Sequence, residues 1–174
     1  MSSGIVLAGA SSAEPAAAMP PLPTGGLVEV DCSTGPVHLN LAWGQYLLRG
    51  KCGDVYVQYK YAKVYLESAE RLFVLSDDNL VMADTVGRLV ISSTGSTIEV
   101  SGRVGSVATD RGCCNKLRLG PTRRVVLRDQ FTRAVFKRLD RLVVRGTHNR
   151  VRVERGRTRV TSNGRDHVLR LRRA

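Results

Sequence analysis

Arginine is the residue type in this chain whose spacing most directly suggests chemistry. Five arginines lie within ten residues near the C-terminal end, and more follow. A guanidinium group donates a fork of hydrogen bonds that matches phosphate, sulfate or carboxylate oxygens. The sequence therefore predicts a polyanion-binding surface made of Arg123, Arg124, Arg128, Arg150, Arg152, Arg155, Arg157, Arg159, Arg170 and Arg172.

The distribution of charge supports the same idea. Residues 1–100 hold 6 Lys and Arg against 10 Asp and Glu, whereas residues 101–174 hold 21 against 5. Such asymmetry indicates a polyanionic partner, either a nucleic-acid backbone or an acidic polymer or protein. The alternative is that the arginines only keep exposed β-structure soluble. Aromatic residues are scarce in the basic half, apart from Phe131 and Phe136, which disfavours binding to single-stranded bases.

Tyrosines form a second candidate surface, for contact with a protein. Tyr56, Tyr59, Tyr61 and Tyr65 fall close together, and alternation along a strand would place Tyr59 and Tyr61 on one face. Amphipathic tyrosines are enriched in protein interfaces. The alternative is that they only cover the flank of the fold.

Catalytic and metal-binding patterns are weak. The acidic residues Asp77, Asp78 and Asp84, with Glu67 and Glu70 upstream, are expected at turns rather than across a cleft, as a glycosidase would need. Three histidines, His38, His148 and His167, are too few and too scattered for a zinc site. We therefore predict a protein that is not an enzyme and uses no cofactor or metal, with a carbohydrate-active enzyme as a remote alternative.

The elements that position these residues are expected to be short strands, because apolar–x–apolar pairs recur about every nine residues. The pairs are Val28/Val30, Val37/Leu39, Val55/Val57, Val64/Leu66, Leu72/Val74, Leu89/Ile91, Ile98/Val100, Leu117/Leu119, Val125/Leu127, Leu142/Val144, Val151/Val153 and Leu169/Leu171. Regular strands without intervening helices predict an all-β solenoid. Similar segments recur at 17–18 residues, so we expect coils of that length with two strands and two turns. A triangular coil with three nine-residue sides is the alternative.

Stacked coils would bring distant residues together. Val151 and Val153 would enter the core while Arg150 and Arg152 face solvent, with Arg133, Arg165 and Arg170 beside them. Turns would carry Asn79, Asn149 and Asn163, either as simple turn formers or as a stacked row of side-chain amides.

Several segments also resemble a known family. Val28-Glu-Val-Asp-Cys32, Leu48 to Val57 with its Gly-Lys-Cys-Gly, and Leu142 to Val153 with Gly146 and Asn149 are similar to family 3060 of the domains of unknown function, an actinobacterial group. The resemblance implies a β-solenoid in envelope or secreted proteins, with no assigned activity.

The cysteines bear on the compartment. The interval between Cys32 and Cys52 is close to one coil, so stacked coils would bring their Cα atoms within disulfide range. The resemblance implies that they pair, whereas in a reducing compartment they would be small core residues. Of the neighbours Cys113 and Cys114, we expect one to point inward and one outward.

The chain is expected to divide into a flexible arm, residues 1–26, and a single solenoid domain, residues 27–174. The arm is rich in Ala, Pro and Gly, and the alternative is a remnant secretory signal. No apolar run is long enough to span a bilayer. The location would be the envelope or the exterior if the resemblance holds, and a virion or the cell interior otherwise. Our leading hypothesis is an electrostatically bipolar scaffold that assembles with itself or with a protein partner.

Overall fold

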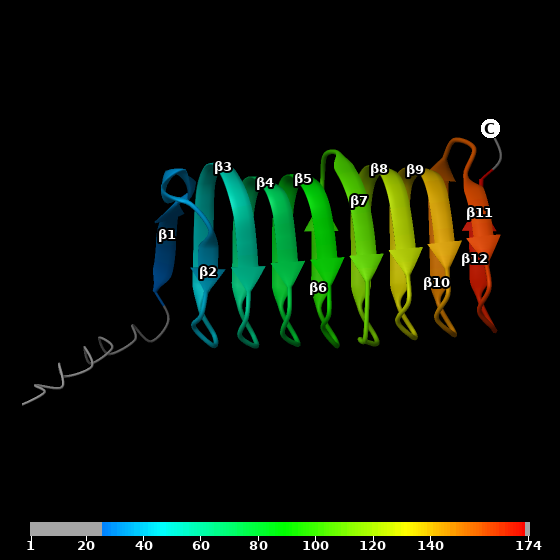
Figure 1. Ribbon diagram of the computed structural model, residues 1–174, viewed down its shortest axis with the longest axis horizontal. Coiled ribbons are helices and arrows are strands. Elements are labelled where there is room, and N and C mark those ends of the chain that lie inside the picture. Colours follow the sequence, from blue (N-terminus) through cyan, green and yellow to red (C-terminus); the bar gives the residue numbers. More distant parts are fainter. Residues whose placement is uncertain (1–25, 173–174) are drawn as a thin grey trace, which may run out of the picture.

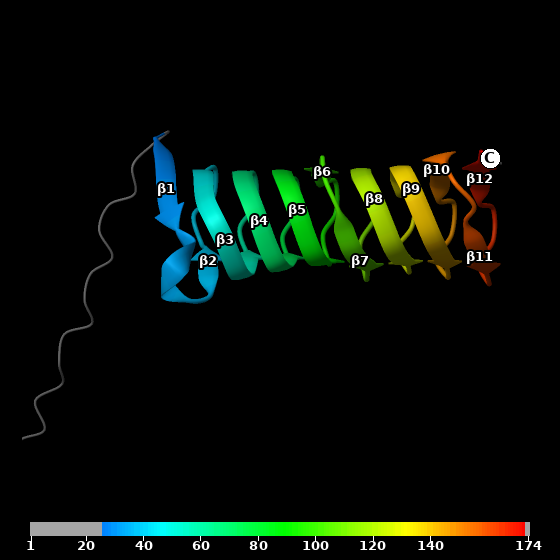
Figure 2. The same cartoon turned by 90° about the horizontal axis from the view of Figure 1, so that it is seen from above.

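The computed structural model describes residues 26–172, which form a parallel β-solenoid (Figure 1). This confirms the predicted fold class. The coils follow one another along a single long axis, with β1 and β12 at opposite ends (Figure 2). The predicted arm, residues 1–26, lies outside the described residues except for Gly26.

Twelve strands make one sheet, in which neighbouring strands run parallel because each strand stacks on its equivalent in the next coil. The strands are β1 (Leu27–Asp31), β2 (Val37–Leu39), β3 (Gln45–Val57), β4 (Lys63–Val74), β5 (Leu80–Ile91), β6 (Thr97–Val100), β7 (Val104–Thr109), β8 (Lys116–Leu127), β9 (Arg133–Val144), β10 (Arg150–Arg155), β11 (Arg159–Ser162) and β12 (Val168–Leu171). A short 3-10 helix, η1 (Cys32–Thr34), follows β1.

Each coil has one sharp turn and one gentler bend. Lys63 pairs with Leu80 in the next coil, and Thr97 pairs with Lys116. Register partners mark the length of one coil, and each coil contains two apolar pairs, one for each side. A triangular coil with three nine-residue sides would contain three pairs and is therefore excluded. Five strands, β3, β4, β5, β8 and β9, are 12 or 13 residues long, because each continues through the bend from one side of the coil to the other.

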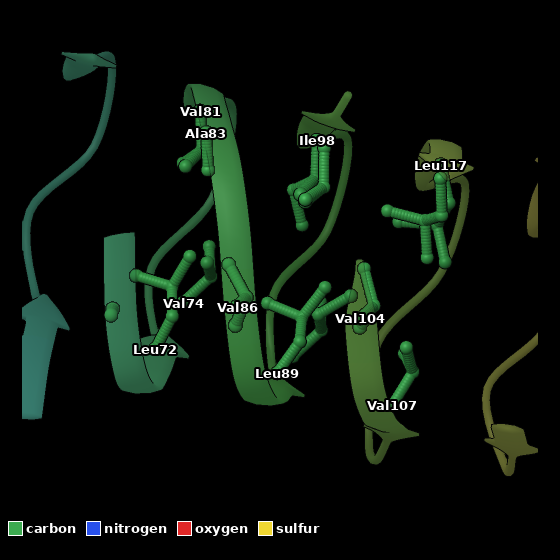
Figure 3. Packing of buried hydrophobic residues seen from close by; sticks show 14 of the residues in the cluster. Leu72, Val74, Val81, Ala83, Val86, Leu89, Ile98, Val104, Val107 and Leu117 are labelled. Atoms are coloured by element: carbon green, nitrogen blue, oxygen red, sulfur yellow. The ribbon is translucent and has the colours of Figure 1, made fainter. Parts of the chain in front are cut away.

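The core lies between the two sides of the coil. Figure 3 shows Val81, Ile98 and Leu117 stacked from coil to coil on one side, with Leu72 and Leu89 on the other. All five side chains are at most 2 % exposed. β-branched and leucine side chains fill this narrow interior in rows, which is why the apolar pairs recur once per side.

The sharp turn depends on one residue in the left-handed backbone region. This position is occupied in successive coils by Trp43, Tyr61, Asp78, Gly95, Cys114, Phe131, His148 and Asp166, all with φ between 54° and 71°. The residue that follows it points inward, and in the middle coils it is a buried polar residue: Asn79, Ser96, Asn115, Thr132 and Asn149.

These buried polar residues bond to the backbone of the neighbouring coil. Oδ1 of Asn79 accepts from the N–H of Ala62 at 2.8 Å, and the N–H of Asn79 in turn donates to Oγ of Ser96 at 3.2 Å. Of the two alternatives for the turn asparagines, the stacked row of amides does not form, because Ser96 and Thr132 separate the buried asparagines. Asn163 is exposed and takes no part, whereas Asn115, which the sequence pattern did not single out, does.

Candidate interaction surface

The surface that carries the candidate site is made by the outward residues on one side of the coil. We call it the first face: the outward side chains of β1, β6, β10 and β12 and of the N-terminal halves of β3, β4, β5, β8 and β9. Parallel pairing in register aligns these residues in columns, one residue per coil. The central column runs Glu29, Leu47, Tyr65, Met82, Glu99, Arg118, Val135, Arg152 and Arg170.

The first face changes sign along the axis. Up to Glu99, the charged residues of its central column are acidic; from Arg118 onward they are basic. The column beside it is also basic towards the C-terminal end, where Lys116, Arg133 and Arg150 follow one another. Its N-terminal part has no acidic residue and includes the cation Lys63 between Gln45 and Leu80. Part of the charge asymmetry of the sequence is thus displayed along the first face.

An acidic groove lies on the N-terminal part of the first face. It has a volume of about 400 Å³. Its lining includes the carboxylates of Glu67, Asp84 and Glu99, and the cation Arg118. The expectation that Glu67 and Asp84 fall at turns is wrong, because they lie within β4 and β5.

Both of these carboxylates already bind the neighbouring coil. Glu67 accepts from the N–H of Gly50 at 2.8 Å, and Asp84 accepts from the hydroxyl of Ser101 at 3.1 Å. Their side chains therefore contribute to stacking as well as to surface charge.

A basic groove lies on the C-terminal part of the same face. It also has a volume of about 400 Å³ and is lined by Arg133, Arg150, Arg152 and Arg170 around apolar side chains. All four arginines are exposed, and none makes an ion pair with a carboxylate within residues 26–172. Cations on adjacent coils, about 4.8 Å apart, repel one another and so favour an anionic ligand or partner.

The ten predicted arginines do not form one surface. Arg150, Arg152, Arg170 and Arg172 belong to the first face. Arg124 and Arg159 lie on the opposite side of the coil, in a column with Arg71, Arg88 and Arg141. The others lie at the end of that opposite side or along the bend: Arg128, Arg123, Arg155 and Arg157.

The four tyrosines are also separated. Tyr65 lies in the acidic groove, whereas Tyr56 lies on the opposite side, stacked between His38 and Phe73 with ring centroids 4.6 and 4.7 Å away. Tyr59 and Tyr61 occupy the sharp turn after β3, so the expected shared strand face is wrong. Tyr61 instead stacks on Trp43, the equivalent turn residue of the preceding coil, at 4.2 Å.

An apolar column on the opposite side was missed by the sequence analysis. Outward positions there carry Tyr56, Phe73, Val90, Ala108, Val126 and Val143. The signal was present as apolar triplets, such as Leu72-Phe-Val and Leu89-Val-Ile, in place of apolar–x–apolar pairs with a polar centre.

The structure pairs Cys32 with Cys52 in a disulfide whose Cα atoms are 4.6 Å apart. Both cysteines are at most 5 % exposed, and the bond joins η1 to the bend of the next coil. It thereby ties the first coil to the second.

Cys113 and Cys114 are free, and neither reaches the core. Cys113 is half-buried and Cys114 exposed, so the expectation of one inward cysteine is wrong; Asn115 takes the inward position. The Cys114 thiol, with burial as a lesser cause, raises the pKa of Cys113, which keeps that thiol protonated to higher pH.

Within residues 26–172, no group of three or more His, Cys, Asp or Glu side chains is arranged to hold a metal ion. His148 lies 3.6 Å from Asp166 in the next turn, and His167 occupies the inward position equivalent to Asn149. No helix in the same range is both long and apolar enough to cross a membrane.

Comparisons with protein-family models, with curated proteins and with solved structures found no match to this chain. The resemblance to family 3060 therefore stays a prediction, and function is argued from the surface alone.

Proposed function

We propose that this protein is a non-enzymatic interaction scaffold, a rod whose first face is acidic towards one end and basic towards the other. The observation that carries the proposal is the change of sign between Glu99 and Arg118, which are register partners on adjacent coils. A rigid stack of coils holds the two charged regions apart along the axis. Each region can therefore attract an oppositely charged partner without neutralising the other.

The proposal predicts association that depends on salt. Opposite charges on exposed surfaces attract over about 30 Å at 0.01 M salt but only about 3 Å at 1 M salt. We expect light scattering to show particles larger than the 19.0 kDa monomer at low salt and their dissociation at high salt. A monomer at every salt concentration would contradict self-association.

Charge-matched variants locate the attraction on the first face. Replacing Glu67, Asp84 and Glu99 by Gln, Asn and Gln removes three negative charges from the acidic groove and should weaken low-salt association. The control removes three negative charges elsewhere, by Glu70→Gln, Asp110→Asn and Asp140→Asn, and should leave association unchanged. Equal loss in both variants would show that net charge, not the first face, is responsible.

A second candidate function is the binding of a polyanion by the basic groove. The four exposed arginines without carboxylate partners, on three adjacent coils, support it. Changing Arg133, Arg150, Arg152 and Arg170 to Ser should lower the salt concentration at which the protein elutes from heparin. The control changes Arg124, Arg128, Arg141 and Arg159, on the opposite side, to Ser. If both variants elute alike, the groove is not the binding site.

A further inference from the structure

Within residues 26–172, the last strand of the solenoid has one edge without a pairing strand. Among the described residues, β12 pairs only with β10. Its inward side chains are not covered, since Leu171 is 37 % exposed and Leu169 is only partly buried. Their equivalents one coil earlier, Val151 and Val153, are 1 % exposed. β12 thus has the pattern of a core strand, and none of the described residues forms a coil beyond it to bury its inward side chains.

Among the described residues, the first strand of the solenoid has a complementary edge without a partner. Within residues 26–172, β1 pairs only with β3, and it lies at the opposite end of the rod from β12 (Figures 1 and 2). Its inward residues Val28 and Val30 are partly buried, and they pack against the hydrophobic core on one side only. Its outward residues are Leu27 and the acids Glu29 and Asp31. The Glu29 carboxylate pairs with Arg49 of the next coil, and the Asp31 carboxylate accepts a hydrogen bond from the N–H of Ser33.

We propose that a second copy of this chain covers the C-terminal edge by adding its β1 to β12 in parallel, so that the sheet continues from one molecule into the next. This inference rests on the proposed scaffold function and names the partner. Open strand edges pair readily with strands that match their pattern. Heterologous pairing of this kind propagates into filaments when it does not close into a ring.

The register follows from the columns of the first face. Continuing each column by one residue places Leu169 beside Val28 and Leu171 beside Val30 in the core. The same register places Arg170 beside Glu29 and Arg172 beside Asp31 outside. Shifting by one residue would turn the arginines inward, so the two sequences Val-Leu-Arg-Leu-Arg and Leu-Val-Glu-Val-Asp match in one register.

Charge also selects the polarity of the junction. Two C-terminal edges would bring Arg170 and Arg172 against their own copies, and two N-terminal edges would do the same with Glu29 and Asp31. Like charges directly opposite on paired strands are destabilising. Only the head-to-tail arrangement pairs unlike charges at both outward positions.

The junction involves one side of the coil. β12 and β1 both belong to the first face, and the chain runs from each β1 onward to its β2 on the opposite side. On the first face, β12 extends one coil further than β11 does on the opposite side. When β1 of the second copy pairs with β12, its β2 is therefore two coil levels away from β11. The strand position between β11 and that β2 stays empty. Arg159 on β11 is consequently outside the pairing and serves as a control position.

Cysteine crosslinking tests the register. In a background with Cys113→Ser and Cys114→Ser, the pair Glu29→Cys and Arg170→Cys places two thiols on adjacent strands, where Cα atoms about 4.8 Å apart suit a disulfide. Mild oxidation at low salt should give multiples of the 19.0 kDa chain on a non-reducing gel. The pair Glu29→Cys and Leu171→Cys points to opposite faces and should give several-fold less.

Charge exchange tests the polarity. Glu29→Arg alone and Arg170→Glu alone should each stay monomeric, because each places like charges at the junction. Mixing the two variants should restore association, whereas the control Arg159→Glu should associate like the unmodified protein. Recovery on mixing also shows that both variants are folded.

The outcomes separate the two proposals. Salt-dependent association with equal crosslinking by both cysteine pairs, or without recovery on mixing, overturns the β12–β1 junction and leaves the scaffold function standing. A protein that is monomeric at every salt concentration overturns the junction and self-association of the scaffold together, and leaves only binding of a different partner.

Discussion

The backbone N–H of Thr132 donates a hydrogen bond of 2.8 Å to Oδ1 of Asn149, which lies one coil further along the axis. The same side chain donates through Nδ2 to the carbonyl of Asp129 at 2.9 Å. Asn149 therefore satisfies a buried donor and a buried acceptor at a sharp turn, where the strands supply no partner.

Asn149→Ala should destabilise the protein strongly. The variant leaves two buried polar groups without a partner, and each costs about 1–3 kcal/mol, so we expect the free energy of unfolding to fall by about 2–6 kcal/mol. Urea denaturation followed by circular dichroism measures it. Asn163→Ala, at an exposed position, is the matched control and should change stability by less than about 0.5 kcal/mol. Equal effects would mean that the buried hydrogen bonds do not matter.

Removing the Cys32–Cys52 disulfide should also reduce stability. The bond closes a loop across a sequence separation of 20, which limits the freedom of the unfolded chain. Loops of this size correspond to about 3 kcal/mol. The variant Cys32→Ala/Cys52→Ala should lose about that amount and become insensitive to reducing agent. Cys113→Ser/Cys114→Ser should keep the full stability and its sensitivity to reductant; an insensitive control would place the effect elsewhere.

Gly146→Ala should be destabilising because the added Cβ would overlap the carbonyl oxygen of Asp129 in the coil before. The overlap involves backbone, so coils must move apart locally and neighbouring hydrogen bonds weaken. Gly53→Ala is the control, since its added Cβ would meet nothing within 4 Å. Thermal unfolding should show a lower midpoint for Gly146→Ala only.

Low pH should reduce the free energy of unfolding, and protonation of Asp77 should account for part of the loss. A hydrogen bond from the N–H of Thr94, with the ion pair to Lys60, lowers the pKa of Asp77 in the folded protein. The unfolded chain then binds a proton more readily, so this stabilisation is present above the unfolded pKa and is lost as pH falls through the lower folded pKa.

Asp77→Asn removes that dependence. Urea midpoints measured from neutral pH down to about pH 2.5, below the ordinary carboxyl range, should fall less steeply in the variant than in the unmodified protein. Asp78→Asn, at the neighbouring turn position, is the control and should keep the steeper slope. Parallel slopes for all three proteins would rule out Asp77 as a source of acid sensitivity.

The fold was predictable because it depends on a simple pattern. Inward residues such as Val64 and Leu66 are apolar and their neighbour Tyr65 is outward, so alternation alone reveals the strand. Arg150 and Arg152 were placed together correctly for the same reason, since both belong to one uninterrupted strand, β10.

The surfaces were less predictable, because alternation is interrupted at each bend. Glu154 and Arg155 are consecutive and both exposed, so the alternation of inward and outward residues is broken there. Counting every second residue from Arg152 therefore does not reveal that Arg159 lies on the opposite side of the coil. The role of Asn115 was not predictable because the coil that contains the vicinal cysteines is longer than the coils before it. This coil runs from Thr97 to its register partner Lys116, so the repeat spacing does not mark Asn115 as a turn residue. The apolar pairs are separated by similar distances in the sequence whether a sharp turn or a bend lies between them. The sequence therefore did not show that Tyr61 lies in a turn and not in a strand.

The stacking of coils along one axis gives the molecule a distinctive response to mechanical load. Hydrogen bonds between coils run parallel to that axis, so tension applied between the two ends acts on one junction at a time. Each coil that detaches releases roughly 18 residues, or about 60 Å of extended chain. The rod should therefore lengthen in regular increments, except at Cys32–Cys52, where the covalent bond holds the first coil until it is reduced.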